Sequence, residues 1–166
     1  DSLRSRGLGD VYKRQFCRTP EEGSLVTGLL NEKGVGPASG TDLFVMVELP
    51  SNVIEADRFI EMMDLSGGSI GSNDLVQTVY AVSRDDLEGY QNPIDARSPS
   101  VKAMIRDIVG KFNSKGMEIG ICGQAPSDFP DEFPAFLVDC GITSISVTPD
   151  TAVAVRGTVA EAEKRA

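Results

Sequence analysis

Short apolar runs alternate with amphipathic stretches along most of the chain, and this alternation restricts the fold more than any other feature. The run 43–47 (LFVMV) is apolar at every position, which is typical of a parallel strand buried on both faces. Further strands are predicted at 69–72, 117–121 and 142–147, each followed by polar or turn residues. Strands that alternate with helices predict a parallel sheet with right-handed crossovers.

The helix expected at 98–115 has the clearest pattern. Ser98 can cap it, Pro99 suits its first position, and apolar residues recur at helical spacing up to Phe112. Other helices are expected from Asn52 to an end at Gly67–Gly68, from residues 127 or 128 to Gly141, and over about 151–165, while 75–98 is interpreted as a long insertion. Residues 16–22 are typical of a further strand end that leads into a helix. Unit lengths near 25 residues predict the C-terminal part of an incomplete (β/α)8 TIM barrel, with about four to five βα units. An open doubly wound α/β sheet fits the periodicity equally well.

Residues 1–15 differ from the rest of the chain. They carry four basic and two acidic side chains and show neither helical nor strand periodicity. They resemble translated adaptor sequence, so we predict a non-native segment outside the fold, with a disordered basic arm as the alternative. Residues 16–166 are then expected to form one partial domain.

Composition excludes several classes of function. The 166 residues contain no histidine, which removes His-based triads and His-ligated zinc, and no nucleotide-binding glycine loop is present. The net charge of −9 without a basic cluster argues against nucleic-acid partners, and no apolar run is long enough to cross a membrane. Three widely spaced cysteines indicate reduced thiols and a cytoplasmic location.

Each predicted strand ends in groups suited to a site, and in a parallel barrel these ends meet on one face. The set comprises Glu48, Asn73, Asp74, Cys122 and Asp150, with Arg84 on the long insertion. Two carboxylates from different strands suit a hard cation such as Mg²⁺. The turn containing Ser72 can aim backbone N–H groups at an anion. The competing interpretations are helix caps and polar strand ends for the acids, a solvated charge for Arg84 and a simple buried thiol for Cys122.

Four stretches occur in one order: VELPSN at 47–52, SIGSNDLVQ at 69–77, GICGQAPSD at 120–128 and SISVTPDT at 144–151. Together they resemble the C-terminal barrel domain of the phosphoenolpyruvate (PEP)-utilising enzymes over about residues 16–156. At position 124 the chain resembles the phosphoenolpyruvate synthase (pyruvate, water dikinase) subfamily, which has Gln there. The phosphate dikinase and sugar phosphotransferase relatives usually have Glu at this position. Val76 and Val147–Thr148 depart from the common Thr and Leu–Asn, which leaves the subfamily open.

This resemblance implies a role for each matching residue. Glu48 and Asp74 would bind Mg²⁺, and Asp74 would also contact the substrate together with Ser72 and Asn73. Arg84 would hold the phosphoryl group. Cys122 would exchange a proton with the methyl or methylene carbon of pyruvate and PEP.

The implied reaction converts ATP, pyruvate and water to AMP, PEP and phosphate through a phosphohistidine. Because this chain has no histidine, we expect a truncated segment that is inactive alone. Its expected partners are pyruvate or PEP, the phosphohistidine and ATP-binding domains of a parent chain, and a second copy in a homodimer. Two alternatives stay open: a Mg²⁺-dependent lyase or aldolase acting on a pyruvate enolate, and a non-catalytic packing or dimerisation module.

Overall fold

A computed structural model describes residues 12–14, 16–83 and 94–165. Its centre is a parallel sheet in which consecutive strands are neighbours, in the order β1-β2-β3-β4-β5. The strands are β1 Tyr12–Arg14, β2 Leu43–Val47, β3 Gly67–Ile70, β4 Glu118–Ile121 and β5 Ser144–Ile145.

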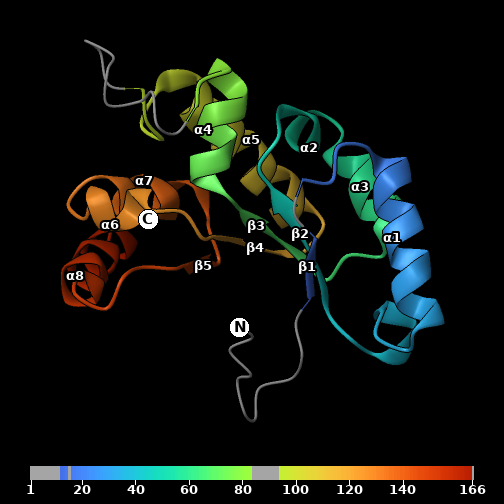
Figure 1. Cartoon of the computed structure of the whole chain (residues 1–166). Coiled ribbons are helices and arrows are strands. Elements are labelled where there is room, and N and C mark those ends of the chain that lie inside the picture. The colour runs from blue at the N-terminus through green and yellow to red at the C-terminus, as the bar shows by residue number, and fades with distance from the viewer. Residues whose placement is uncertain (1–11, 15, 84–93, 166) are drawn as a thin grey trace.

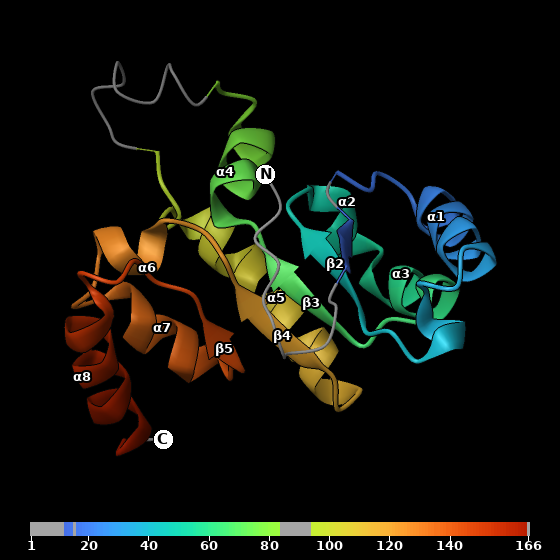
Figure 2. The same ribbon diagram turned by 60° about the horizontal axis from the view of Figure 1, so that its bottom comes forward.

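The helices form an arc around one side of this sheet (Figures 1 and 2). Helices between β1 and β3 cover its first half and those after β3 cover the rest, with α8 packed against α7. The helices are α1 Pro20–Glu32, η1 Pro37–Ser39, α2 Pro50–Ile54, α3 Ala56–Met63, α4 Ser72–Tyr80, α5 Pro99–Ser114, α6 Ala125–Asp128, α7 Phe133–Cys140 and α8 Ala152–Glu163.

The strand order separates two of the expected topologies. A doubly wound sheet contains a point at which the strand order reverses, and the described strands show no such reversal. Right-handed crossovers between consecutive neighbours place all the helices on one face. The sheet is therefore consistent with part of an α/β barrel. Within the described residues it does not close, because β1 and β5 each pair with a single neighbour.

The hydrophobic core lies between the sheet and its helices. Phe59 of α3, Phe112 of α5 and Phe133 of α7 are almost completely buried there, against strand residues such as Ile119 and Ile121. In β2 the alternate residues Leu43, Val45 and Val47 belong to this core, as expected for one face of a strand covered by helices.

Strand β3 starts earlier than the sequence pattern predicts. Gly67 and Gly68 were expected to end the preceding helix, but they are the first two residues of the strand. A β-carbon on Gly68 would lie 2.9 Å from the ring of Phe112, and one on Gly67 would lie 2.4 Å from the ring of Phe44. Glycine is therefore present because two aromatic rings pack directly on the strand, which is a tertiary requirement.

Four other elements differ from expectation. The single helix predicted from residue 127 or 128 is instead two helices, α6 and α7, which begin at Ala125 and Phe133. The region 75–98, interpreted as a long insertion, begins inside helix α4, which spans Ser72–Tyr80. The last strand is limited to Ser144–Ile145 within the predicted 142–147. Helix α2 begins at Pro50 and places Asn52 in its first turn, so the prediction that Asn52 starts the helix was wrong.

The segment 1–15 was expected to stand outside the fold, yet residues Tyr12–Arg14 form β1 and pair in parallel with β2. This strand occupies the position before α1, where the pattern of residues 16–22 predicts the end of a strand. The proposal that residues 1–15 are non-native is not tested by this pairing and stays a prediction.

An ion pair closes the turn that leads into α5. Arg97 Nη2 lies 2.9 Å from Asp95 Oδ2, and the guanidinium also stacks on the ring of Phe129. Partial burial raises the pKa of Asp95, but hydrogen bonds and charge from Arg97 together outweigh burial and hold that pKa below its usual value. The ion pair therefore favours the folded state when the carboxyl is ionised.

Replacing Asp95 with asparagine is expected to cost about 0.5–1 kcal/mol at pH 7, the range of a solvent-accessible ion pair. Because the folded-state pKa is depressed, the contribution is complete above the unfolded value near 4 and disappears as the pH falls through the folded value. Urea denaturation of the chain and of Asp95→Asn at pH 7 and pH 3 measures this difference. An equal difference at both pH values would contradict the assignment.

Candidate functional site

The residues that follow strands β2 to β5 form one row across the carboxyl edge of the sheet: Glu48, Gly71, Cys122 and Ser146. Backbone bonds extend the pairing into this row, since Gly71 N–H donates to the Val47 carbonyl at 3.0 Å and Cys122 N–H donates to the Ile70 carbonyl at 2.9 Å. Ser146 N–H likewise donates to the carbonyl of Ile121 at 3.0 Å. Neighbouring strands are about 4.8 Å apart, so the backbones of Glu48 and Cys122, two strands apart, are separated by roughly 10 Å across the sheet.

Gly71 occupies the place between the acid and the thiol. A β-carbon at this position would lie 2.9 Å from Glu48 Oε2 and 3.2 Å from the methyl carbon of Met46. The absence of a side chain lets the Glu48 carboxylate lie against the start of α4.

Glu48 is completely buried, and several bonds fix its position. Its Oε1 accepts a hydrogen bond from Phe16 N–H at 2.5 Å. Asn52 Oδ1 accepts the N–H groups of Glu48 and Leu49 at 3.2 and 3.0 Å, and Asn52 Nδ2 donates to the carbonyl of Cys17 at 2.7 Å. The side chain of Asn52 thus holds the backbone that carries the acid, a role that its sequence position did not reveal.

Asp74 lies in the first turn of α4, next to the end of β2. Thr78 Oγ1 lies 2.9 Å from the carbonyl oxygens of both Glu48 and Asp74, which ties the two acidic residues to neighbouring backbone. Asp74 Oδ1 accepts a hydrogen bond from Gln77 Nε2 at 3.2 Å. Among the residues described, no three Cys, Asp or Glu side chains form a metal-binding cluster. A pair of carboxylates suits Mg²⁺, which commonly takes its remaining ligands from water and substrate oxygens.

Ser72 starts α4 and packs under the loop that follows β4. Its side chain is fully buried, and among the described residues its Oγ has no hydrogen-bond partner. A β-carbon on Gly123 would lie only 1.6 Å from this hydroxyl. Ser72 and Gly123 therefore bring the N-terminus of α4 against the turn that carries Cys122. A buried hydroxyl left in this state costs free energy, which a polar ligand would relieve.

Cys122 and Asn73 border a polar hollow of about 150 Å³ at this rim. Cys122 Sγ accepts a hydrogen bond from Ser69 Oγ at 3.1 Å and lies 4.0 Å from Met46 Sδ. Asn73 Oδ1 accepts the N–H of Gln124 at 3.3 Å, which links α4 to the turn after β4. The hollow is lined by Asn73, Cys122, Gly123, Gln124, Ser127, Ser146, Val147 and Thr148.

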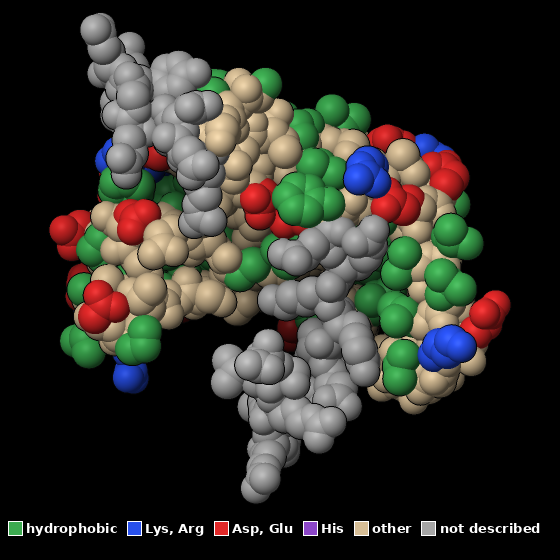
Figure 3. Space-filling view, viewed as in Figure 1, with side chains coloured by type: hydrophobic (Ala, Val, Ile, Leu, Met, Phe, Trp, Pro, Cys, Tyr) green, Lys and Arg blue, Asp and Glu red, His purple; other side chains and the backbone are tan. Residues whose placement is uncertain are grey.

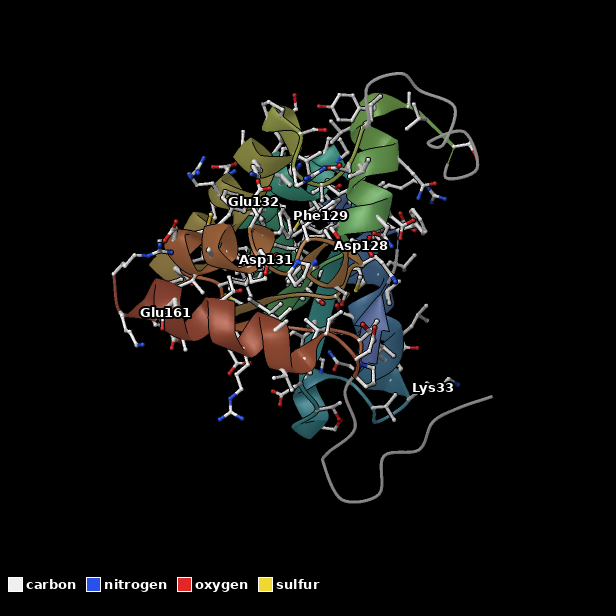
Figure 4. All side chains as sticks on the ribbon, turned by 90° about the vertical axis from the view of Figure 1, so that its left-hand side faces the viewer. Lys33, Asp128, Phe129, Asp131, Glu132 and Glu161 are labelled. Atoms are coloured by element: carbon white, nitrogen blue, oxygen red, sulfur yellow. The ribbon has the colours of Figure 1, made fainter. Side chains whose placement is uncertain are left out.

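A second hollow of about 220 Å³ lies between α4 and α6. Asn73 and Gln124 line both hollows, while Asp128 and Phe129 line the second and lie beside the lower turns of α4 (Figure 4). On the face shown in Figure 3 the visible Lys and Arg side chains stand singly rather than in a patch. The described residues include no helix that is both long and apolar enough to cross a bilayer.

The structure brings most of the predicted site residues to one edge: Glu48, Ser72, Asn73, Asp74 and Cys122. Asp150 does not join them, because it is exposed in the turn before α8, where hydrogen bonding from Thr148 lowers its pKa. Arg84 lies outside the described residues. Sequence reasoning missed Ser69 and Asn52, although Ser69 stands two positions before Gly71 and must therefore share its face of the sheet.

Residues 23–164 match the family described as PEP-utilising enzyme, PEP-binding domain. The chain belongs to this family. This PEP-binding domain is 45% identical over 151 residues to a phosphoenolpyruvate synthase of Aquifex aeolicus, which covers 90% of the chain and 17% of that relative. It is 45% identical over 150 residues to the Synechocystis enzyme of the same name, and 37% identical over 151 residues to that of Escherichia coli. Both cover 90% of the chain and 18% of the relative.

The PEP-binding domain thus spans less than a fifth of the length of these curated relatives. The family match confirms the resemblance that the four motifs indicated, and each of these motifs supplies one residue of the row at the carboxyl edge. The roles of individual residues stay predictions.

Proposed function

We propose that this PEP-binding domain holds pyruvate or PEP at the carboxyl edge of the sheet and serves a phosphoenolpyruvate synthase reaction. The names of the relatives and their 37–45% identity over most of the chain support this proposal. The whole reaction would also use phosphohistidine and ATP-binding domains carried elsewhere in a parent chain. A closed (β/α)8 barrel and a homodimer formed through it belong to the same proposal.

The observation that carries the proposal is the row in which Gly71 separates Glu48 from Cys122. The acid and the thiol are two strands, or roughly 10 Å, apart across the sheet, a distance that a metal ion together with a three-carbon ligand would span. Glu48 and Asp74 would hold Mg²⁺, which supplies Lewis-acid stabilisation of negative charge developing on the substrate oxygen. Both acids are fixed by neighbouring backbone and offer oxygen ligands, as this ion prefers.

The thiol of Cys122 would act on carbon. In the direction of PEP formation its thiolate takes a proton from the methyl group of pyruvate, and the C–H electron pair becomes the double bond of the enolate. In the reverse direction the thiol returns that proton to the methylene carbon. A positioned acid–base group of this kind contributes about 10²–10⁴-fold in rate.

Ser72 and Asn73 would orient the ligand from the N-terminus of α4. The backbone N–H groups and dipole of a helix start attract anions, which suits a carboxylate or phosphoryl group. The buried hydroxyl of Ser72 would gain a partner from such a ligand. Arg84 would neutralise phosphoryl oxygens, as the family resemblance implies.

Replacing Glu48 with glutamine is expected to weaken Mg²⁺-dependent binding of oxalate, a mimic of enolpyruvate, by about 100-fold or more. The substitution keeps the size of the side chain but removes a charged ligand, and losing even an outer-shell partner costs 10–100-fold in metal affinity. Titration calorimetry of the chain with oxalate, in the presence and absence of Mg²⁺, measures this.

The matched control is Glu118→Gln, at the exposed start of β4 on the opposite edge of the sheet, which should bind as the unchanged chain does. Equal oxalate affinity in Glu48→Gln and the unchanged chain would refute the assignment of Glu48. A folded chain that binds no oxalate at all would instead favour a non-catalytic packing module.

A further inference from the structure

Ser69 lies on β3, one row below the carboxyl edge, and contacts the sulfur of Cys122. Its Oγ donates a hydrogen bond to Cys122 Sγ at 3.1 Å, and only 5% of its surface is exposed. In the sheet Ser69 pairs with Met46 on one side and Gly120 on the other. The hydroxyl is therefore held by strand pairing on both sides, below the thiol.

Gly120 lies beside Ser69 in the strand that leads to Cys122. Gly120 lies in β4 and Cys122 directly follows this strand, so the two residues, two positions apart, share one face of the sheet. A side chain at position 120 would stand beside Ser69, directly below the thiol. A β-carbon at Gly120 would lie 2.3 Å from Ser144 Oγ on the neighbouring strand.

The charged groups that the described strand ends and first helical turns place around Cys122 are carboxylates. They are Glu48 after β2 and Asp74 on α4. Negative charges near a thiol disfavour its ionised form. A hydrogen bond donated to the sulfur acts in the opposite direction, because it favours the thiolate.

We infer that Ser69 is a positioning residue for Cys122, holding the sulfur at the carboxyl edge of the sheet and stabilising it while it carries negative charge. The inference rests on the proposed function, in which Cys122 exchanges a proton with the substrate carbon. In that exchange the proton moves between Sγ and carbon. Ser69 keeps its own proton throughout and donates a hydrogen bond to the sulfur.

The test is the rate at which Cys122 of the 166-residue chain is alkylated by iodoacetamide at pH 7.5, read for each cysteine by mass spectrometry. Ser69→Ala should slow alkylation of Cys122 about three- to fourfold relative to Cys140. Losing a hydrogen bond to a charged group lowers the thiolate population about tenfold. The greater nucleophilicity of the more basic thiolate offsets part of that loss.

Two further variants control for structural effects. Ser69→Thr retains the hydroxyl and should restore the ratio to within about twofold, while Ser144→Ala, on the other side of Gly120, should leave it unchanged. General loosening would instead accelerate alkylation, including that of the buried Cys17. If Ser69→Ala does not fold, Ser69→Gly removes the same hydroxyl and carries the same expectation.

An unchanged or increased Cys122 ratio in the alanine variant, or equal ratios for alanine and threonine, would overturn the inference. Mg²⁺-dependent oxalate binding by the unchanged chain is measured in parallel. A Ser69-dependent thiol in a chain that binds no oxalate would support the hydrogen bond and refute the proposed function. Oxalate binding by a chain whose Cys122 reactivity does not depend on Ser69 would support the proposed function and refute the role of Ser69.

Discussion

Replacing Gly123 with alanine is expected to destabilise the fold by about 1–3 kcal/mol, the usual cost of overpacking. The new methyl carbon would lie 1.6 Å from Ser72 Oγ, 2.8 Å from Ser72 Cβ and 3.1 Å from Ser72 N. Rotation of the serine side chain relieves the first of these contacts but not the other two. The turn carrying Cys122 must therefore move away from α4. Urea denaturation of the variant and the parent chain measures the loss.

The double variant Gly123→Ala with Ser72→Gly identifies the cause, since removing the serine side chain should restore most of the lost stability. Gly110→Ala is the matched control, because a methyl group there meets nothing within 4 Å in the middle of α5. It should stabilise the chain by about 0.5–1 kcal/mol. A Gly123→Ala chain as stable as the parent would show that the two segments do not pack as described.

Replacing Phe112 with alanine is expected to cost about 3–5 kcal/mol, the largest loss of stability among the substitutions considered. The ring is 1% exposed and packs directly on Gly68 of β3, which has no side chain of its own to fill the space. Because β3 leads straight into Gly71 and α4, the cavity would loosen the segment that supports the site. Thermal and urea unfolding, compared with the parent, measure the effect.

Phe136→Ala provides the comparison, since Phe136 on α7 is only partly buried and should cost clearly less. If the two alanine variants lost equal stability, the core would not be centred on the contact between α5 and β3. A loss below about 1 kcal/mol for Phe112→Ala would have the same meaning, because full burial of a phenyl ring contributes more than that.

The sequence pattern predicted best those elements that are determined by residues within the same segment. The bounds of β2 at Leu43–Val47 match the apolar run, and α5 starts at Pro99 as its first-turn proline indicates. Gly67 and Gly68 were misplaced because their place in β3 depends on rings that come from α5 and β2. In sequence alone, a glycine pair after a helical pattern indicates the end of the helix. Only the packing of the two rings shows why Gly67 and Gly68 belong to a strand.

The same division holds for the site. Glu48, Asp74 and Cys122 were identifiable because each follows a recognisable apolar run and lies in a family motif. The bond from Ser69 to Cys122 joins residues 53 positions apart, and that from Asn52 to Cys17 joins residues 35 positions apart. No periodicity within one segment reports such a contact, since it arises from the register between strands.

The single row formed by Glu48, Gly71, Cys122 and Ser146 limits how chains of this architecture can change in length. Adding or deleting one residue inside a strand would move the side chain that this strand places in the row to the helix side of the sheet. The site would then lose that residue. Insertions leave the row unchanged only where they lie outside the strands and the residues that directly follow them. Variation in size among related proteins should therefore concentrate between the strands and helices, while strand lengths stay constant.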